Sequence, residues 1–357
     1  MRIFRKMCTS LARAGYRTVL IVADGLGDAE ISGVSILDVG RSRSRLRRLL
    51  LAPLRLRAAA LRVGADLFHL HDPELLPLGV ALKRRGHRVV FDSHEDVPSQ
   101  ILHKPYLPSL IAPSLSLVYS VYEAYASRQL DGVVAATPFI REKFRRFARR
   151  VVDVSNFPIR DEFGTLPESE EPRNGVCYVG DLSLIRGVRE LCAAMTLVRS
   201  EALLRICGAF SDAAAKQTAM AHSGWNRVQF HGVVDRAGIR SVFSRSVAGL
   251  VTLHPVPNYV NSQPIKMFEY MSAGLPVIAS DFPLFREIVS GNDCGILVDP
   301  MSAQSIADAI DFLVDHPVEA ARLGRNGRAA VLARYNWEHE ESALFKFYRE
   351  ILDAGPA

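Results

Sequence analysis

The chain has 357 residues, 48% hydrophobic and 23% charged, a balance that excludes a largely disordered protein. One hydrophobic core stops growing at roughly 250 to 300 residues, so the length predicts two domains. Residues 1–160 hold 26 Lys and Arg against 14 Asp and Glu, whereas residues 161–357 are net acidic, which indicates different partners for the two halves.

The spacing of the cysteines and the length of the apolar segments indicate the cellular compartment of the protein. The five cysteines are far apart and form no Cys-x-x-Cys pair, so we expect neither a disulfide framework nor a zinc site. No run reaches the ~18 apolar residues of a spanning helix, and the N-terminus has no apolar signal core. These features predict a cytoplasmic protein.

The first half alternates helical and strand patterns. Residues 2–15 have helical spacing and end at a glycine, and a buried strand is expected at 17–25. Further strands are expected at 65–74, 87–96 and 131–138, each ending in polar residues. This alternation predicts a doubly wound parallel sheet, whose ligands collect outside the carboxyl ends of the strands.

Three segments of this half indicate a surface partner. Arg and Leu interleave over 40–64, as in helices that lie on anionic lipid, and the positive segment 141–150 adds charge. The apolar segment 107–122 is interrupted by proline but able to dip into a membrane interface. Nucleic acid is the alternative partner and a plain solvated face a third interpretation. Because no aromatic interleaving or nucleic-acid motif is present, we expect an anionic membrane surface and no nucleic acid.

Histidines lie at the expected strand ends. Strand alternation places His69 and His71 on the same side, and His94 follows the next strand. A metal site would join His71, Asp72, His94, Glu95 and Asp96. Neither spacing is a tight ligand pattern, so we expect no metal and predict a polar cleft for a hydroxylated substrate.

A segment rich in proline and acidic residues, 161–174, is the expected linker. The alternation then restarts, which predicts a second doubly wound domain. Its strands are expected at 175–182, 202–210, 227–234, 247–255, 275–281 and 294–300.

The segment 178–191, YVGDLSLIRGVREL, suits an anion. A strand ends at Gly180, and Arg186 and Gly187 open a helix, which places unpaired backbone N–H groups and a guanidinium beside one strand end. An ordinary strand-to-helix turn with a surface arginine is the alternative.

A second candidate lies at 258–281, where Pro264 opens and Gly274 closes an apolar helix. Ser262, Gln263 and the following amides would offer donors to an anion at the positive end of the helix. Lys266 adds a full charge, and Glu269, one turn later, suits the hydroxyls of a sugar. The alternative is an ion pair between Lys266 and Glu269, worth only a few tenths of a kcal/mol.

Taken together, the chain resembles glycosyltransferases of the GT-B fold, in particular the retaining family 4 enzymes of bacterial capsule, exopolysaccharide or O-antigen synthesis. The motifs that carry the resemblance are HDPELLPLG, VVFDSHEDVP, VAATPFI, SNFP, YVGDLSLIRG, FHGVV, KMFEYMSAGLPVIASD and GILVDP. The resemblance implies two Rossmann-like domains that face a cleft. It assigns 1–165 to the acceptor side, 172–332 to the nucleotide sugar, and 333–357 to a helix that packs back on the first domain.

The resemblance also implies roles for residues. Glu269 matches the second Glu of the family's E-x7-E pattern, which holds ribose hydroxyls, and His71 matches a histidine near the transferred sugar. His94 and Glu95 lie in the loop that faces the acceptor. The expected catalytic residues are His71, Arg186 and Lys266. The expected donor-binding residues are Gly180, Arg186, Gly187, Asn261, Ser262, Lys266 and Glu269.

Three departures from the family pattern matter. Asn261 replaces the first Glu of E-x7-E, which excludes a carboxylate nucleophile there and favours departure of the leaving group from the front face. Asp181 stands where many relatives have an arginine, a cation that Lys266 is expected to replace. Relatives begin with a strand that this sequence lacks. Since a lost central strand would leave two unpaired edges, we expect the true start to lie upstream.

The expected reaction is transfer of a hexose or N-acetylhexosamine, with retention, from a UDP- or GDP-sugar to a lipid-linked or saccharide acceptor. We expect no cofactor, and a peripheral location at the inner face of the plasma membrane. An isomerase of the UDP-N-acetylglucosamine 2-epimerase type and a degenerate, non-catalytic transferase subunit are the alternatives.

Overall fold

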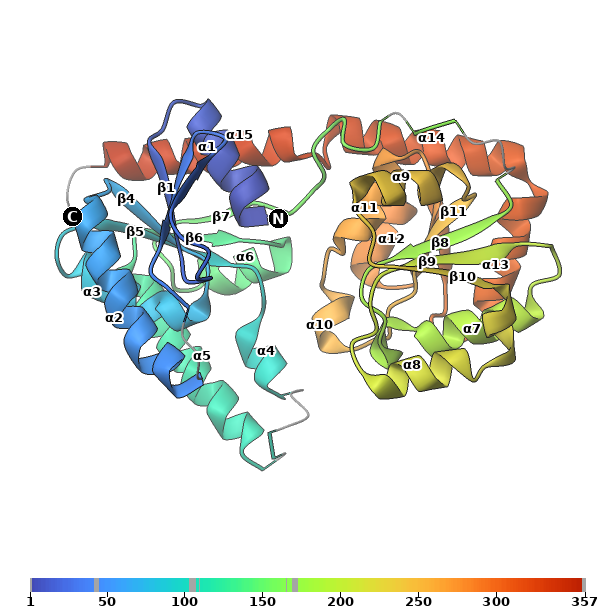
Figure 1. Ribbon diagram of the computed structural model, residues 1–357, viewed down its shortest axis with the longest axis horizontal. Coiled ribbons are helices and arrows are strands. Elements are labelled where there is room, and N and C mark those ends of the chain that lie inside the picture. Colours follow the sequence, from blue (N-terminus) through green and yellow to red (C-terminus); the bar gives the residue numbers. More distant parts are fainter. Residues whose placement is uncertain are drawn as a thin grey trace. The chain divides into compact units, whose positions relative to one another are not determined.

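The computed structural model describes residues 2–41, 45–102, 107–108, 110–164, 166–168 and 173–354. It divides into two compact units, Met1–Asn156 with His339–Ala357, and Phe157–Glu338 (Figure 1). The division precedes the expected linker, 161–174, because Phe157 and Phe163 are already buried in a core cluster of the second unit.

The first unit contains two separate sheets, β1-β3-β2 and the all-parallel β4-β5-β6-β7. The strands are β1 Thr18–Val22, β2 Ala29–Ile31, β3 Val34–Asp38, β4 Leu67–Leu70, β5 Arg88–Ser93, β6 Gly132–Ala135 and β7 Val151–Asp153. Among the described residues, β1 pairs only with β3 and β4 only with β5. The expectation of a further strand upstream stays a prediction.

One strand pair corrects the expectation of a purely parallel sheet. Strands β2 and β3 are antiparallel and joined at Ser32 and Gly33, which both have positive φ, 53° and 74°. Two successive residues with positive φ are typical of the tight turns that close β-hairpins. This short hairpin was missed because its strands are brief and one is fully exposed.

Helices cover both faces of the first unit. They are η1 Arg2–Cys8, α1 Thr9–Arg13, α2 Arg45–Val63, η2 Pro73–Leu75, α3 Leu76–Lys83, α4 Val97–Leu102, α5 Ala112–Gln129, α6 Pro138–Arg145 and the last helix, α15 Trp337–Asp353. Most of α15 belongs to this unit, and the ring of Phe347 fills the space where a Cβ on Gly132 would lie.

The second unit is a six-stranded parallel sheet of order β10-β9-β8-β11-β12-β13. Its strands are β8 Gly175–Val179, β9 Leu203–Cys207, β10 Val228–Gly232, β11 Ala248–Val251, β12 Val277–Ser280 and β13 Gly295–Val298. All six lie within the predicted segments. The order reverses between β8 and β11, and such a switch point is where doubly wound sheets bind ligands.

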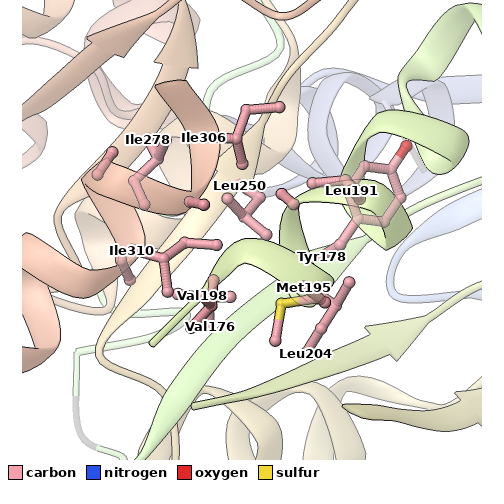
Figure 2. Close-up of a cluster of buried hydrophobic side chains, with 14 of the residues drawn as sticks. Val176, Tyr178, Leu191, Met195, Val198, Leu204, Leu250, Ile278, Ile306 and Ile310 are labelled. Atoms are coloured by element: carbon pink, nitrogen blue, oxygen red, sulfur yellow. The ribbon is translucent and has the colours of Figure 1, made fainter. Parts of the chain in front are cut away.

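The helices of this unit are η3 Leu184–Arg186, α7 Val188–Leu197, α8 Ala213–Met220, η4 Ser223–Arg227, α9 Arg236–Ser244, α10 Pro257–Val260, α11 Ile265–Ser272, α12 Pro283–Val289, α13 Ala303–Asp315 and α14 Pro317–Ala333. Figure 2 shows Leu191 of α7 and Ile306 of α13 packed over strand residues such as Leu250. A second cluster includes α11 residues such as Phe268. All five cysteines are buried and free.

Candidate functional site

Helix α11 behaves as the sequence predicts. It begins after Pro264 and is followed by Gly274, whose φ of 70° suits a glycine. Four of its apolar side chains are fully buried, namely Met267, Phe268, Tyr270 and Met271. The ion pair considered between Lys266 and Glu269 is absent, because Glu269 pairs with Arg236 instead.

The half-buried Lys266 ends in a buried Nζ that pairs with no anion among the described residues. Its Nζ lies 3.4 Å from the centroid of the Tyr178 ring and, among the described residues, has no hydrogen-bond partner. Burial, and then the nearby Arg186, lower the pKa of Lys266 well below its ordinary value. A buried charge without a counterion is costly, so this position favours binding of an anion.

Arg186 brings a second cation to the same place. Its Nε donates to the Tyr259 hydroxyl at 3.1 Å, and Nη1 lies 3.7 Å from the Asp181 carboxylate. The following Gly187 has φ 80°, and a Cβ there would lie 2.4 Å from the Thr252 carbonyl oxygen. Only glycine therefore allows this turn to lie against β11.

Gly180 completes the anion site. It has φ 125°, and a Cβ built there would lie 3.6 Å from Lys266 Nζ and 3.9 Å from Arg186 Nη1. The bare backbone at the end of β8 thus lies directly beside two cations. The structure brings Gly180, Arg186 and Lys266 together at the switch point, in an arrangement suited to phosphate oxygens.

Glu269 is buried, with 6% of its surface exposed. Arg236, at the start of α9, donates to its carboxylate at 2.6 Å and also lies 3.1 Å from Glu162. The Arg236 guanidinium lies 5.2 Å from the Phe163 ring. Sequence reasoning missed Arg236, and the 33 residues that separate it from Glu269 carry no signal of the pairing.

The loop before α11 holds Asn261 and Ser262, both half-buried. The Ser262 hydroxyl donates to the Tyr259 carbonyl oxygen at 2.9 Å, which ties this loop to α10. The expected donor role of both residues stays a prediction.

In the first unit, His69 and His71 lie on the same side of β4, as predicted, with ring centroids 4.3 Å apart. His71 Nδ1 lies 2.9 Å from Asp92, which also accepts from Arg2 at 2.8 Å. Burial would raise the pKa of Asp92, but Arg2 and His71 outweigh it and hold that pKa well below its usual range. Sequence reasoning did not assign Asp92 to the site, although it lies in a quoted motif.

His94 and Glu95 are exposed just beyond β5. Glu95 accepts from the Gln100 side chain at 2.6 Å, which fixes the loop to α4. Asp96 pairs with Lys143 at 2.7 Å, and Lys143 also reaches the buried Glu123 at 2.6 Å. Within the described residues, the five side chains considered as metal ligands do not gather around one point.

Family models match both units. Residues 162–330 match the family described as glycosyl transferases group 1, and residues 2–158 match a glycosyl transferase 4-like domain. The two matches cover nearly the whole chain. The chain belongs to the group 1 glycosyltransferases, the retaining family 4.

Individual proteins support this assignment. The chain is 27% identical to α-maltose-1-phosphate synthase of Mycobacterium tuberculosis over 49% of its own length and 47% of that protein, so it spans about half the length of this curated relative. It is 25% identical to α-D-kanosaminyltransferase of Streptomyces kanamyceticus over 89% of this chain and 82% of the relative.

Solved structures show the fold. Sucrose-phosphate synthase from Thermosynechococcus elongatus aligns with a TM-score of 0.79 at 20% identity, over 99% of this chain and 93% of that one. Anabaena HepE in complex with UDP-glucose aligns with a TM-score of 0.72 at 16% identity, over 96% and 95%. The chain therefore has the GT-B fold of two Rossmann-like domains, with a partly mixed sheet in the first.

Proposed function

We propose that this chain transfers a hexose or N-acetylhexosamine, with retention, from a UDP- or GDP-sugar to a lipid-linked saccharide in bacterial cell-surface polysaccharide synthesis. The observation that carries the proposal is the buried, uncompensated cation of Lys266 beside Arg186 and Gly180. HepE, which shares the fold, is in complex with UDP-glucose, and this supports a nucleotide-sugar donor here.

The proposed chemistry concerns the leaving group. As the bond from the anomeric carbon to the diphosphate breaks, negative charge develops on the phosphate oxygens next to Arg186 and Lys266. Preorganised charge of this kind is typically the largest catalytic contribution. The acceptor oxygen then bonds to the same face of the sugar and its proton passes to the departing phosphate. Asn261 cannot form a covalent glycosyl intermediate as a carboxylate does, so a front-face route is favoured.

A panel of nucleotide sugars in a thermal-shift assay tests the proposal. A donor at 100 times its dissociation constant stabilises the protein by roughly 2.7 kcal/mol, which gives a measurable shift. Epimer formation without transfer would indicate the isomerase. No shift with any nucleotide would indicate the degenerate subunit.

Arg186→Ala is expected to lower turnover chiefly through the leaving group. Losing one charge-stabilising donor costs about 3 kcal/mol, or roughly a hundredfold in kcat. The loss should be largest for donors with poor leaving groups, measured with donor analogues whose leaving groups differ in acidity. An equal loss for good and poor leaving groups would contradict the role. Arg189→Ala, an exposed neighbour on α7, is the control.

A membrane surface is the proposed location of the acceptor. Helix α5 and Ile111, the residue before it, expose a stripe of apolar side chains, with exposed fractions of 55% at Ile111, 66% at Val118, 63% at Val121 and 50% at Tyr125. Their spacing places them on one helical face. Arg84 donates to the Tyr125 hydroxyl at 3.3 Å, so positive charge lies at one end of the stripe.

No helix among the described residues is long and apolar enough to span a bilayer. We therefore propose peripheral attachment to the inner face of the plasma membrane.

Replacing Val118 and Val121 together by glutamate is expected to abolish vesicle binding. Each valine contributes about 1.5 kcal/mol on burial, so binding should weaken by at least about a hundredfold. Sedimentation with phosphatidylglycerol vesicles measures this. Val318→Glu, at a still more exposed valine on α14 of the second unit, should bind as the wild type does. A double variant that still sediments would contradict the assignment. Arg45, Arg47 and Arg48 of the basic segment lie in α2, but their side chains are outside the described part of the structure.

A further inference from the structure

A polar cluster in the first unit has an unexplained buried atom. His69 Nε2 is buried and, among the described residues, has no hydrogen-bond partner. The other ring nitrogen, Nδ1, lies 2.5 Å from the Tyr348 hydroxyl of α15. A neutral ring that donates Nδ1–H to this oxygen leaves a bare lone pair on Nε2.

Two further potential metal ligands, His71 and Asp92, lie close to His69. One ligand atom each from His69, His71 and Asp92 lie within 4.8 Å of one another. The strand geometry explains the grouping. His69 lies on β4 and His71 directly follows its last residue, two positions later, so both face the same side. Asp92 follows the Leu70–Phe91 pair of β4 and β5, which places its carboxylate beside His71.

We propose that His69, His71 and Asp92 form a binding site for Zn²⁺ or a similar borderline first-row cation, whose occupancy inhibits the enzyme. Two imidazoles and a carboxylate are the ligand set of tetrahedral catalytic zinc sites, with a fourth position for water. The Tyr348 hydroxyl supplies the outer partner that orients a metal-bound histidine. The sequence-based expectation of no metal weighed a set that shared His71 with this one but did not include His69 or Asp92.

The charges around the cluster determine how tightly the site would bind a cation. Arg2 already holds one Asp92 oxygen at 2.8 Å, and the other oxygen accepts from His71. A cation must therefore replace the His71–Asp92 hydrogen bond and tolerate a guanidinium nearby, which makes binding reversible and weaker than at a structural zinc site. The inhibition rests on the proposed function, because His71 would no longer be available to the sugar. Metal binding itself does not depend on it.

The test uses the full chain after chelation. Calorimetry with ZnCl₂ is expected to show one zinc per chain, and Co²⁺ is expected to give the strong visible absorption of a four-coordinate site. His69→Ala and Asp92→Asn should each weaken zinc binding more than a hundredfold, and Tyr348→Phe by about 10- to 100-fold. His87→Ala, a half-buried histidine outside the cluster, is the matched control.

Several results would overturn the proposal. These are no zinc uptake, a weak octahedral Co²⁺ spectrum in the wild type, or a folded His69→Ala variant with unchanged affinity. The Co²⁺ spectrum needs no variant and remains decisive if the substitutions prevent folding. Zinc should also inhibit sugar transfer in the wild type but not in His69→Ala. A chain that transfers no sugar when it is free of zinc, but still takes up zinc, would refute the proposed function and leave the metal site intact.

Discussion

Lys266→Met is expected to lower turnover by about a hundredfold to a thousandfold, equivalent to roughly 3 to 4 kcal/mol, and to leave the ligand-free protein at least as stable as the wild type. Both effects have one cause. The Lys266 ammonium is buried near Arg186 and donates no hydrogen bond to any of the described residues. Methionine keeps the length of the side chain and removes the uncompensated charge, so the free protein loses little while the diphosphate loses a counterion.

Single-turnover kinetics and urea unfolding of the same preparations measure the two effects. Lys216→Met, an exposed lysine on α8 of the same unit, is the matched control and should change neither quantity. Normal turnover in Lys266→Met would refute the catalytic role. A clear loss of stability would show that the ammonium has a structural partner.

The depressed pKa of Lys266 predicts a pH dependence. Between the folded-state pKa and the ordinary value near 10.5, the unfolded chain holds a proton that the folded chain lacks. The free energy of unfolding therefore rises with pH in this window, by at most about 1.4 kcal/mol per pH unit. Comparison with Lys266→Met isolates this contribution, and the variant's stability advantage should shrink as pH rises. Binding of a diphosphate should take up a proton in the same window, measurable by calorimetry in buffers of different ionisation enthalpy.

Glu269→Gln is expected to weaken nucleotide-sugar binding severely. A hydrogen bond to a charged group contributes about 1.5 to 3 kcal/mol, so each ribose hydroxyl that loses the carboxylate should cost roughly ten- to hundredfold in affinity. Glutamine has nearly the same shape as glutamate, so the substitution mainly removes the negative charge. Calorimetry with the best donor of the panel measures the loss.

A comparison of donors with ribose and 2′-deoxyribose sharpens this test. The wild type should discriminate between them, and Glu269→Gln should discriminate less. Glu162→Gln is the matched control, because it removes the other carboxylate beside Arg236 and should keep the discrimination. Unchanged affinity in Glu269→Gln would show that the ribose lies elsewhere.

Strands and helices were predicted correctly from the sequence where the local pattern of apolar residues matches the residues that are buried in the fold. All six strands of the second unit were predicted, because buried parallel strands are short apolar runs bounded by glycine and polar turns. Helix α11 was predicted because Pro264 and Gly274 are residues typical of the two ends of a helix. The β2–β3 hairpin was missed because β2 has only three residues, all exposed, and so carries no apolar pattern.

The sequence by itself determined the class of fold, the two doubly wound domains, and the residues Gly180, Arg186 and Lys266 as candidates for an anion site. Strand alternation also placed His69 and His71 on one side. Only the tertiary structure decided the partners. Glu269 pairs with Arg236 rather than Lys266, and Asp92 joins the two histidines. Spacing along one helix limits which neighbours a charge can reach, but contacts between elements distant in sequence decide which of them it meets.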